Sequence, residues 1–298
     1  MSNVEPRFGR LITAMVTPFN DERELDLDRA QALATRLIEG GNDSLIINGT
    51  TGESPTVFYP QKIELFRAVV EAIGGKAPVI ANVGDNCTAD TVDFAKDVAK
   101  LGVDGFMCVV PYYNKPPQEG MYQHFKTIAD AVELPIILYN IPGRCVVNMK
   151  AETTLRLAND CENVIAVKEA SGKMDQIATI AAAAPEGFSV YSGDDSATYD
   201  VMRLGGAGVI STTGNVAPER MKELVTKCAE GKWDEAWAAH EALLPLMNGL
   251  FETSNPILVK EALKLVGFPV GGVRLPLIDA TAEQSARLAS IMREVGVL

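Results

Sequence analysis

The chain has 298 residues, of which 47% are hydrophobic and 22% are charged, values typical of a globular protein with a full core. Its 39 acidic and 27 basic side chains give a net charge of −12, which repels phosphate backbones and anionic membrane surfaces. Neither nucleic acid nor a membrane is therefore expected as a partner. An anionic substrate would need a local group of cations.

The N-terminal ten residues lack the apolar core of a signal peptide, and no later apolar run approaches the ~20 residues of a membrane helix. We therefore expect a cytoplasmic protein. The five cysteines are scattered without a C-x-x-C pair, which is typical of reduced, mostly buried thiols. The two histidines, His124 and His240, fall in separate helical patterns, which argues against a histidine zinc site or a Ser-His-Asp triad.

Short apolar runs alternate with amphipathic helical patterns along most of the chain. In one such pattern, Phe94, Val98 and Leu101 share a helical face that ends at Gly102. The apolar runs predict eight strands over residues 11–19, 43–49, 78–84, 105–113, 135–142, 164–171, 188–195 and 206–215.

Eight strands, each followed by a helix and without Gly/Ser-rich linkers, predict an α/β protein with a (β/α)8 TIM barrel. An open doubly wound sheet is the alternative, but the nucleotide-binding turns usual in that fold are absent. From about residue 231 only helical patterns follow, the last with a capping-box spacing between Thr281 and Gln284. We therefore expect a catalytic barrel domain over residues 1–230 and a C-terminal helical extension over residues 231–298. The extension would cover the barrel mouth or make subunit contacts.

The predicted strand at 164–171 ends on a lysine, Lys168, and active sites of such barrels lie at the C-terminal strand ends. By alternation Lys168 shares the inward face with Val164 and Ala166, whereas Ile165 and Val167 face the other way.

A lysine buried there loses its proton readily, and a neutral amine is a nucleophile. Lys168 is therefore predicted to form a Schiff base. The alternative is an ordinary strand-end lysine that is paired with Glu169 or a loop carboxylate.

Tyr139 and Arg144 follow the neighbouring strand, whose backbone lies ~4.8 Å away in such a sheet. The phenol of Tyr139 can exchange protons with a carbinolamine on Lys168, although a core tyrosine that only packs is the alternative. Arg144 can bind a substrate carboxylate in bidentate fashion, although loop arginines are often solvated.

The segment NGTTGES, residues 48–54, offers backbone N–H groups and the hydroxyls of Thr50 and Thr51, which suit a carboxylate. The same string also suits an ordinary turn. Asp194 and Asp195 follow the seventh strand, where phosphate-binding barrels offer donors, so they argue against a phosphorylated substrate.

Six motifs, GTTGES, PYYNKP, LYNIPGR, VKEASG, SGDD and GVIST, resemble in order and spacing those of the dihydrodipicolinate synthases of the N-acetylneuraminate lyase superfamily. The resemblance covers nearly the whole chain. It implies a (β/α)8 barrel with a C-terminal helical extension, a homotetramer built as a dimer of dimers, and no metal or organic cofactor. It also implies that Lys168 forms an imine with pyruvate, and that the enamine attacks aspartate 4-semialdehyde. The product would be 4-hydroxytetrahydrodipicolinate, an early intermediate of lysine and diaminopimelate synthesis.

The resemblance also implies roles for single residues. Thr51, Tyr139 and Tyr113 would form a proton relay, with Tyr113 reaching into a neighbouring subunit's site. Thr50 and Thr51 would hold the pyruvate carboxylate, and Arg144 the semialdehyde carboxylate. The backbones that would line the lysine's pocket are those of Gly193 and Ile210.

The chain departs from the family in one cleft. In lysine-inhibited members, the helix after GES carries two histidines in the inhibitor cleft, where this chain has Tyr59 and Lys62. Asp90 replaces an expected glutamate. A cation at Lys62 opposes a cationic amino acid, so we expect weak or absent feedback inhibition by lysine. The other residues expected in the cleft are Ser54, Asn86 and Tyr112.

Two other functions compete with the synthase. N-acetylneuraminate lyases and other 2-keto-3-deoxy sugar-acid aldolases share the imine chemistry, but they generally lack an arginine at the position of Arg144. The sialate lyases also tend to have Ser-Thr in place of Thr50 and Thr51. A non-catalytic protein that binds a 2-oxo acid is the other alternative.

Overall fold

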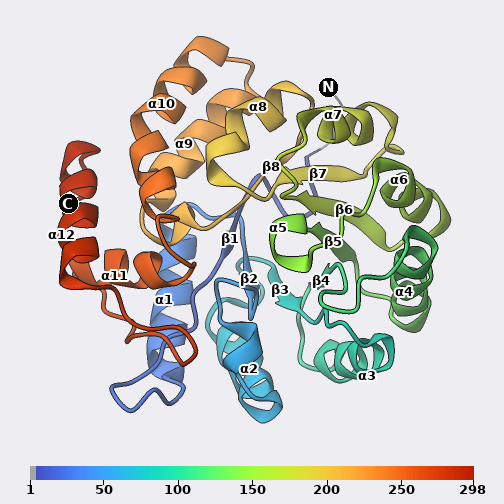
Figure 1. The fold of residues 1–298 in the computed structure, drawn as a ribbon, viewed down its shortest axis with the longest axis horizontal. Helices are drawn as coiled ribbons and strands as arrows, with labels where there is room; N and C mark the ends of the chain where they lie inside the picture. Colours follow the sequence, from blue (N-terminus) through green and yellow to red (C-terminus); the bar gives the residue numbers. More distant parts are fainter. Residues whose placement is uncertain (1–4) are drawn as a thin grey trace.

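The structure, a computed structural model, describes residues 5–298; residues 1–4, part of the stretch expected to lack a signal peptide, lie outside the described residues. Within the described range, eight parallel strands close into a barrel in sequence order, which confirms the predicted fold (Figure 1). Thr13 on the first strand pairs with Ser211 on the last and completes the closure. The strands are β1 (Leu11–Ala14), β2 (Ser44–Ile47), β3 (Val79–Asn82), β4 (Gly105–Val109), β5 (Ile136–Asn140), β6 (Val164–Glu169), β7 (Ser189–Ser192) and β8 (Gly208–Ser211).

Helices surround the barrel on its outer side (Figure 1). In the first of them, the Asp26 side chain accepts the N–H of Arg29 at 2.9 Å, which caps the N-terminus, and Leu33 and Leu37 are fully buried. The barrel helices are α1 (Leu27–Glu39), α2 (Tyr59–Ile73), α3 (Thr88–Ala99), α4 (Gln118–Ala131), the short α5 (Pro142–Cys145), α6 (Ala151–Asp160), α7 (Met174–Ala183), α8 (Thr198–Arg203) and α9 (Pro218–Ala229). Short 3-10 turns follow β2, β7 and β8 at η1 (Ser54–Thr56), η2 (Asp195–Ala197) and η3 (Thr213–Asn215).

Strand side chains form two separate apolar clusters, as expected for a closed barrel. On β5, Ile137 and Tyr139 belong to the small cluster inside the barrel. Their neighbours Ile136 and Leu138 belong to the large cluster between the barrel and the helices. The barrel interior is therefore a packed core, and polar side chains reach solvent only at its ends.

Strand β6 breaks the alternation expected from the sequence. Its pairing with β5 slips by one residue, so that Ile165 is an extra residue in the strand. Val164 consequently packs in the outer cluster and Ile165 against the inner one, opposite to the prediction. Alternation resumes at Ala166, and Lys168 still faces the barrel interior beside Tyr139.

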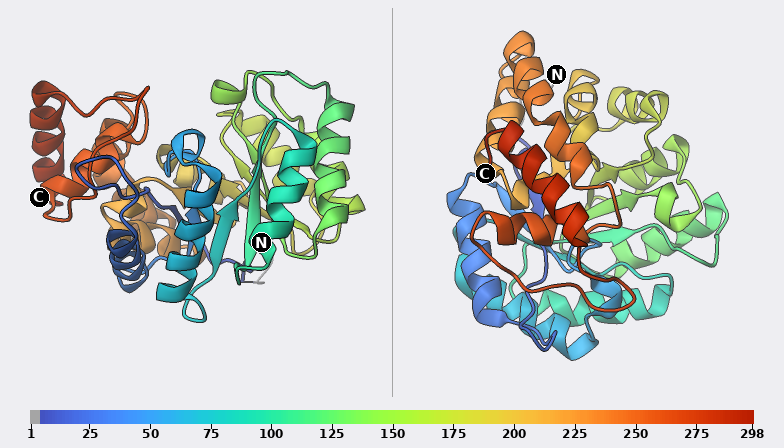
Figure 2. Two further views of the ribbon diagram at one scale, coloured as in Figure 1. Left: turned by 90° about the horizontal axis from the view of Figure 1, so that it is seen from below. Right: turned by 60° about the vertical axis from the view of Figure 1, so that its left-hand side comes forward.

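The C-terminal extension, residues 231–298, stands beside the barrel next to α9 and α1 (Figure 2). It contains α10 (Trp233–Gly249), α11 (Ile257–Leu265) and α12 (Ala282–Glu294). The capping box predicted between Thr281 and Gln284 is present at the start of α12, which packs on α10 and α11. The segment between α10 and α11 reaches the barrel mouth.

All five cysteines are free, and four of them are buried, as predicted. His124 and His240 lie on different helices, α4 and α10, which also confirms the prediction. Across residues 5–298, no helix is both long enough and apolar enough to cross a lipid bilayer.

Candidate active site

Lys168 lies at the end of β6, where its side chain is enclosed by the barrel. The residue is 6% exposed, and its Nζ lies 4.3 Å from the centre of the Tyr139 ring. Burial lowers the pKa of Lys168 to about 8; the charge of Asp195 raises this pKa, and that of Arg144 lowers it. About a tenth of the amines are then neutral at pH 7.

Glu169, the neighbouring carboxylate, does not pair with Lys168. Its oxygens accept the Asn140 Nδ2 at 3.0 Å, the Ser171 backbone N–H at 2.9 Å and the Gln176 Nε2 at 3.0 Å. No ion pair in residues 5–298 includes Lys168. The ordinary interpretation of Lys168 as a paired strand-end lysine is therefore wrong.

Asp195 influences Lys168 from a distance, because its own oxygens are occupied. The carboxylate is 2% exposed and accepts the backbone N–H groups of Thr212 and Thr213 at 2.9 and 2.8 Å. The hydroxyls of Ser211 and Thr213 also donate to it. These bonds tie the end of β7 to the end of β8, so Asp195 supplies a fixed charge without holding the lysine.

Tyr139 is the cross-strand neighbour of Lys168 in the β5–β6 register. It is 4% exposed, and burial raises the pKa of Tyr139 to about 12, while Arg144 and a hydrogen bond from Thr50 lower it. The phenol therefore keeps its proton at neutral pH. It can donate this proton to an oxygen on a group held by Lys168.

The two consecutive threonines face different surroundings. Thr50 lines the same cavity as Tyr139 and lowers the pKa of its phenol. Thr51 is 3% exposed; its Oγ1 accepts the Asn255 Nδ2 at 2.8 Å and lies 3.5 Å from the Thr212 Oγ1. The structure thus places Thr50, and not Thr51, on the cavity wall with Tyr139, and the relay of Thr51, Tyr139 and Tyr113 stays a prediction. The reason is that successive side chains of this turn point in different directions.

A cavity of about 420 Å³ opens at the C-terminal ends of the strands. Thr50, Tyr112, Tyr139 and Arg144 are among the side chains that line it. Arg144 lies on α5, directly after β5, and provides a cation at the wall. The cavity can therefore hold an anionic substrate next to the tyrosine that covers Lys168.

Ile210 lies on β8 and Gly193 directly after β7, and their predicted place in the wall of the lysine's pocket stays a prediction. Ile210 belongs to the inner cluster with Tyr139. The Gly193 N–H donates to the Glu169 carbonyl at 2.8 Å, and a Cβ at Gly193 would lie 2.6 Å from that of Ala170. Position 193 therefore requires glycine because β6 and β7 approach closely there.

Tyr113 does not join this cavity within its own chain. It is 87% exposed, and its φ of 70° is unusual for a residue with a side chain. Its neighbour Tyr112 turns inward, where its hydroxyl donates to Asp85 at 3.1 Å. The two tyrosines of PYYN therefore point to different places.

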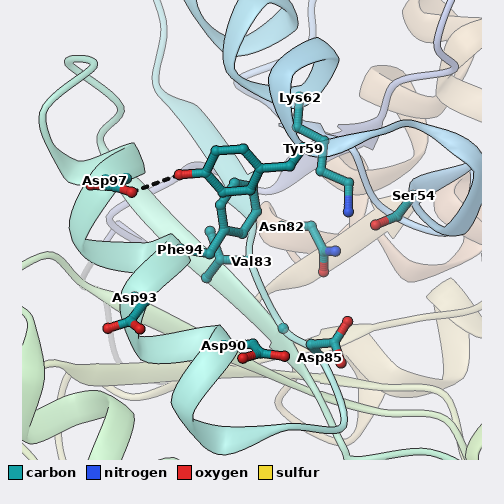
Figure 3. Close-up of a pocket in the computed structure, with 11 residues that line it drawn as sticks. Ser54, Tyr59, Lys62, Asn82, Val83, Asp85, Asp90, Asp93, Phe94 and Asp97 are labelled. Carbon is teal, nitrogen blue, oxygen red and sulfur yellow. Dashed lines mark hydrogen bonds between the residues drawn. The ribbon is translucent and has the colours of Figure 1, made fainter.

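The predicted inhibitor-cleft residues divide between two cavities. A second cavity of about 340 Å³ is lined by Ser54, Tyr59, Lys62 and Asp90 (Figure 3). Ser54 and Lys62 also line the first cavity, as does Tyr112. Asn86 lines neither, but its Nδ2 donates to the Tyr112 carbonyl at 3.2 Å.

The second cavity is more acidic than the sequence comparison suggested. Besides Asp90, it is lined by Asp85, Asp93 and Asp97, and the Tyr59 hydroxyl donates to Asp97 at 2.6 Å (Figure 3). Burial lowers the pKa of Lys62, and the charge of Asp85 opposes this shift. Among the residues that line this cavity, Lys62 is therefore the one basic side chain, and it faces four aspartates.

Sequence reasoning missed two links between the C-terminal extension and this site. One is the bond from Asn255 to Thr51, and the other is a buried ion pair between Lys260 and Glu53 at 2.6 Å. The Asn-Pro pair at 255–256 indicates a turn, and nothing in its spacing points to Thr51. Within residues 5–298, no group of three or more His, Cys, Asp and Glu side chains is arranged to hold a metal ion.

Comparisons with known proteins identify the family of the chain. Residues 7–295 match the model of the dihydrodipicolinate synthetase family. A 4-hydroxy-tetrahydrodipicolinate synthase from Moorella thermoacetica is 52% identical, over 98% of this chain and 100% of that protein.

Solved structures give the same result. The dihydrodipicolinate synthase from Cyanidioschyzon merolae with lysine bound is 45% identical, with a TM-score of 0.97 over 99% of this chain and 100% of that chain. The enzyme from Acinetobacter baumannii, chloride-inhibited and complexed with pyruvate, is 36% identical, with a TM-score of 0.95 over 98% and 100% of the two chains. The chain therefore belongs to the dihydrodipicolinate synthetase family.

Proposed function

We propose that the chain catalyses the 4-hydroxy-tetrahydrodipicolinate synthase reaction, in which pyruvate and L-aspartate 4-semialdehyde condense through an imine on Lys168. The observation that carries the proposal is Lys168 itself, a buried lysine without an ion-pair partner against the Tyr139 ring. The names of the curated relatives support the choice of reaction. The Acinetobacter baumannii structure, which contains pyruvate, supports the choice of 2-oxo acid.

The neutral amine of Lys168 attacks C2 of pyruvate, and the carbinolamine loses water to give an imine. The protonated imine nitrogen withdraws electrons, so C3 loses a proton and becomes an enamine. The enamine carbon adds to the aldehyde of the semialdehyde. The amino group of the adduct then attacks C2 and releases Lys168 as the ring of 4-hydroxytetrahydrodipicolinate closes. One water leaves for each pair of substrates joined.

Tyr139 donates and takes back the protons of the carbinolamine steps, because its raised pKa keeps the phenol protonated at neutral pH. Thr50, which lines the cavity together with this phenol, takes the place of Thr51 as the second member of the relay. Tyr113 of a second copy completes the relay. Its own exposure of 87% supports a role outside its own chain.

The two substrate carboxylates are held by different groups. The backbone N–H groups and hydroxyls of Thr50 and Thr51 hold that of pyruvate, and the Arg144 guanidinium holds that of the semialdehyde. The backbones of Gly193 and Ile210 enclose the lysine. None of these steps calls for a metal or an organic cofactor.

Turnover with different aldehydes tests the reaction. The chain should convert pyruvate and aspartate semialdehyde, and it should cleave N-acetylneuraminate and 2-keto-3-deoxy sugar acids far more slowly. Arg144→Gln should raise the KM for the semialdehyde by ~10-fold or more and leave the KM for pyruvate nearly unchanged. Preferential cleavage of a sugar acid would favour the aldolases, and pyruvate binding without product in a single turnover would favour a binding protein.

A shared site implies an oligomer, and we propose a homotetramer built as a dimer of dimers. Tyr113→Phe alone and Lys168→Ala alone should be nearly inactive. Mixing the two under conditions that exchange subunits should restore part of the activity, because some sites then receive both intact residues. Failure of mixing to restore any activity would contradict the shared site. The free cysteines support a reducing compartment, which we propose is the cytoplasm.

Feedback by lysine is proposed to be weak. The Cyanidioschyzon merolae relative has lysine bound. In this chain the Lys62 amine already provides a cation in the second cavity, whose wall also carries Asp85, and the ammonium of a bound lysine would be repelled by it. Strong inhibition of turnover by micromolar lysine would contradict the proposal. Lys62→Ala should increase any inhibition that exists, because the acidic wall then lacks its own cation.

A further inference from the structure

One side chain of the C-terminal extension contacts a threonine of the candidate site directly. Asn255, between α10 and α11, donates its Nδ2 to the Thr51 Oγ1 at 2.8 Å, across 204 positions of the sequence. Asn255 is 7% exposed and Thr51 3%, so water does not compete freely for this bond. The Asn255 Oδ1 is also buried, and no group in residues 5–298 donates to it. Asn255 is therefore attached to its polar surroundings chiefly through Thr51.

This contact determines the direction in which the Thr51 hydroxyl donates. A threonine hydroxyl has one proton and two lone pairs. Because the amide N–H of Asn255 occupies a lone pair, the proton of Thr51 points away from Asn255; the Thr212 Oγ1, 3.5 Å away, also lies within reach of this hydroxyl. A carboxylate accepts hydrogen bonds and cannot donate them, so a hydroxyl held in this way is prepared to bind one.

The same turn is held to the extension at a second point. Glu53, two residues after Thr51, contacts the Lys260 Nζ at 2.6 Å and accepts the Arg274 backbone N–H at 2.9 Å. Lys260 also donates to the Gly272 carbonyl at 2.8 Å. These contacts hold the backbone of the turn, whereas Asn255 acts on the hydroxyl itself.

We propose that Asn255 is a positioning residue, which orients the Thr51 hydroxyl as a donor to the carboxylate of the 2-oxo acid and so makes the C-terminal extension part of the substrate site. The inference rests on the proposed function, because it needs the carboxylate of pyruvate next to Thr51. Asn255 should therefore affect the binding of pyruvate and not that of the semialdehyde.

Asn255→Ala and Asn255→Leu test the proposal, and Leu keeps most of the side-chain volume if the smaller residue perturbs the fold. Each should raise the KM for pyruvate by roughly 10-fold, the factor expected for one hydrogen bond to a charged group, and change kcat and the KM for the semialdehyde by less than about threefold. Asn248→Ala, at an exposed position near the end of α10, is the matched control and should behave like the parent.

A double-mutant cycle with Thr51→Val gives the sharper result. Without the Thr51 hydroxyl, Asn255→Ala should have no further effect on the KM for pyruvate. Four results would each overturn the inference. They are additive effects of Asn255→Ala and Thr51→Val, equal changes in the KM values for pyruvate and the semialdehyde, an unchanged KM for pyruvate, and loss of the fold in both Asn255 variants. Trapping of the imine distinguishes failure of this inference from failure of the proposed function. If borohydride traps no pyruvate on parent Lys168, the proposed function fails; if it does and the Asn255 variants bind pyruvate normally, only this inference fails.

Discussion

The molecule buries two lysines in two different regions, and only one of them is suited to catalysis. Lys168 at the barrel centre is 6% exposed and Lys260 in the extension 3% exposed. Burial lowers the pKa of each to about 8. Lys260 touches Glu53 and donates to the Gly272 carbonyl, whereas Lys168 faces the Tyr139 ring without an ion-pair partner. Burial alone therefore does not make a nucleophile, because the amine must also be free of a carboxylate partner.

The carboxylates that act on the two lysines, Asp195 and Glu53, also differ in whether they contact the lysine. Asp195 raises the pKa of Lys168, but its oxygens are already occupied by donors from the end of β8. Glu53 raises the pKa of Lys260 through direct contact. The first arrangement leaves the lysine lone pair available whenever the proton is lost, and the second uses the ammonium to join two parts of the fold.

Replacing each lysine by arginine separates these roles most strongly. Arginine stays protonated and forms no imine, so Lys168→Arg should reduce kcat by at least ~10³-fold. Lys260→Arg preserves a cation for Glu53 and should keep most of the activity. Steady-state turnover of the two purified variants is the measurement. Substantial activity in Lys168→Arg would break the comparison.

Replacing each lysine by methionine should affect stability more at Lys260 than at Lys168, whereas replacement by arginine affects activity more at Lys168. Lys260→Met leaves the Glu53 carboxylate buried without its partner and should lower the free energy of unfolding by about 3–5 kcal/mol. Lys168→Met removes a buried cation that has no ion-pair partner, and should leave the fold as stable or make it more stable. Urea titrations of both variants decide the point. A larger loss in Lys168→Met would contradict this order.

The stability difference between Lys168→Met and the parent should depend on pH. The folded pKa of Lys168, about 8, lies below the unfolded value of ~10.4, so between these values the unfolded chain binds more protons. The parent therefore gains stability from this residue as pH rises through that range. The advantage of Lys168→Met should shrink by about 2 kcal/mol between pH 8 and pH 10. Both proteins keep Lys260, so its contribution cancels, and a difference that is constant with pH would refute the low pKa of Lys168.

A smaller effect on stability is expected from a substitution in the turn that carries Arg144, which belongs to the Lys168 region. Val146 ends this turn with a φ of 68°, which is strained for a β-branched side chain, and it is 66% exposed. Val146→Gly should raise the unfolding free energy by about 1 kcal/mol. The change should leave the Lys260 region untouched. Thermal or urea unfolding measures the change in stability, with Val147→Ala in the next position as a control. A loss of stability in Val146→Gly would contradict the strain at Val146.

The barrel was predictable from the sequence because the apolar runs and helical faces alternate through most of the chain. The strand ends were less predictable. Residues 11–19 were expected as a strand, but β1 ends at Ala14, while Met15, Val16 and Phe19 remain buried after it. Apolar composition indicates burial and does not distinguish a strand from a buried loop. The extra residue at Ile165 in β6 was likewise invisible, because a bulge leaves no mark on composition.

The candidate site was predictable where a residue type and a strand end coincide, as for Lys168 and Tyr139. It was not predictable where local geometry decides. Thr50 and Thr51 are identical neighbours, and only the geometry of the turn shows that Thr50 lines the cavity with Tyr139 whereas Thr51 contacts Asn255. Asn255 lies 204 positions from its partner, so no local pattern could identify it.

Borohydride reduction in the presence of pyruvate, followed by mass mapping of the peptides, tests the central comparison most directly. We expect the reduced pyruvate adduct on Lys168 and none on Lys260, although the pKa of each is about 8. Labelling of Lys260 or of another lysine in place of Lys168, or no labelling at all, would contradict it.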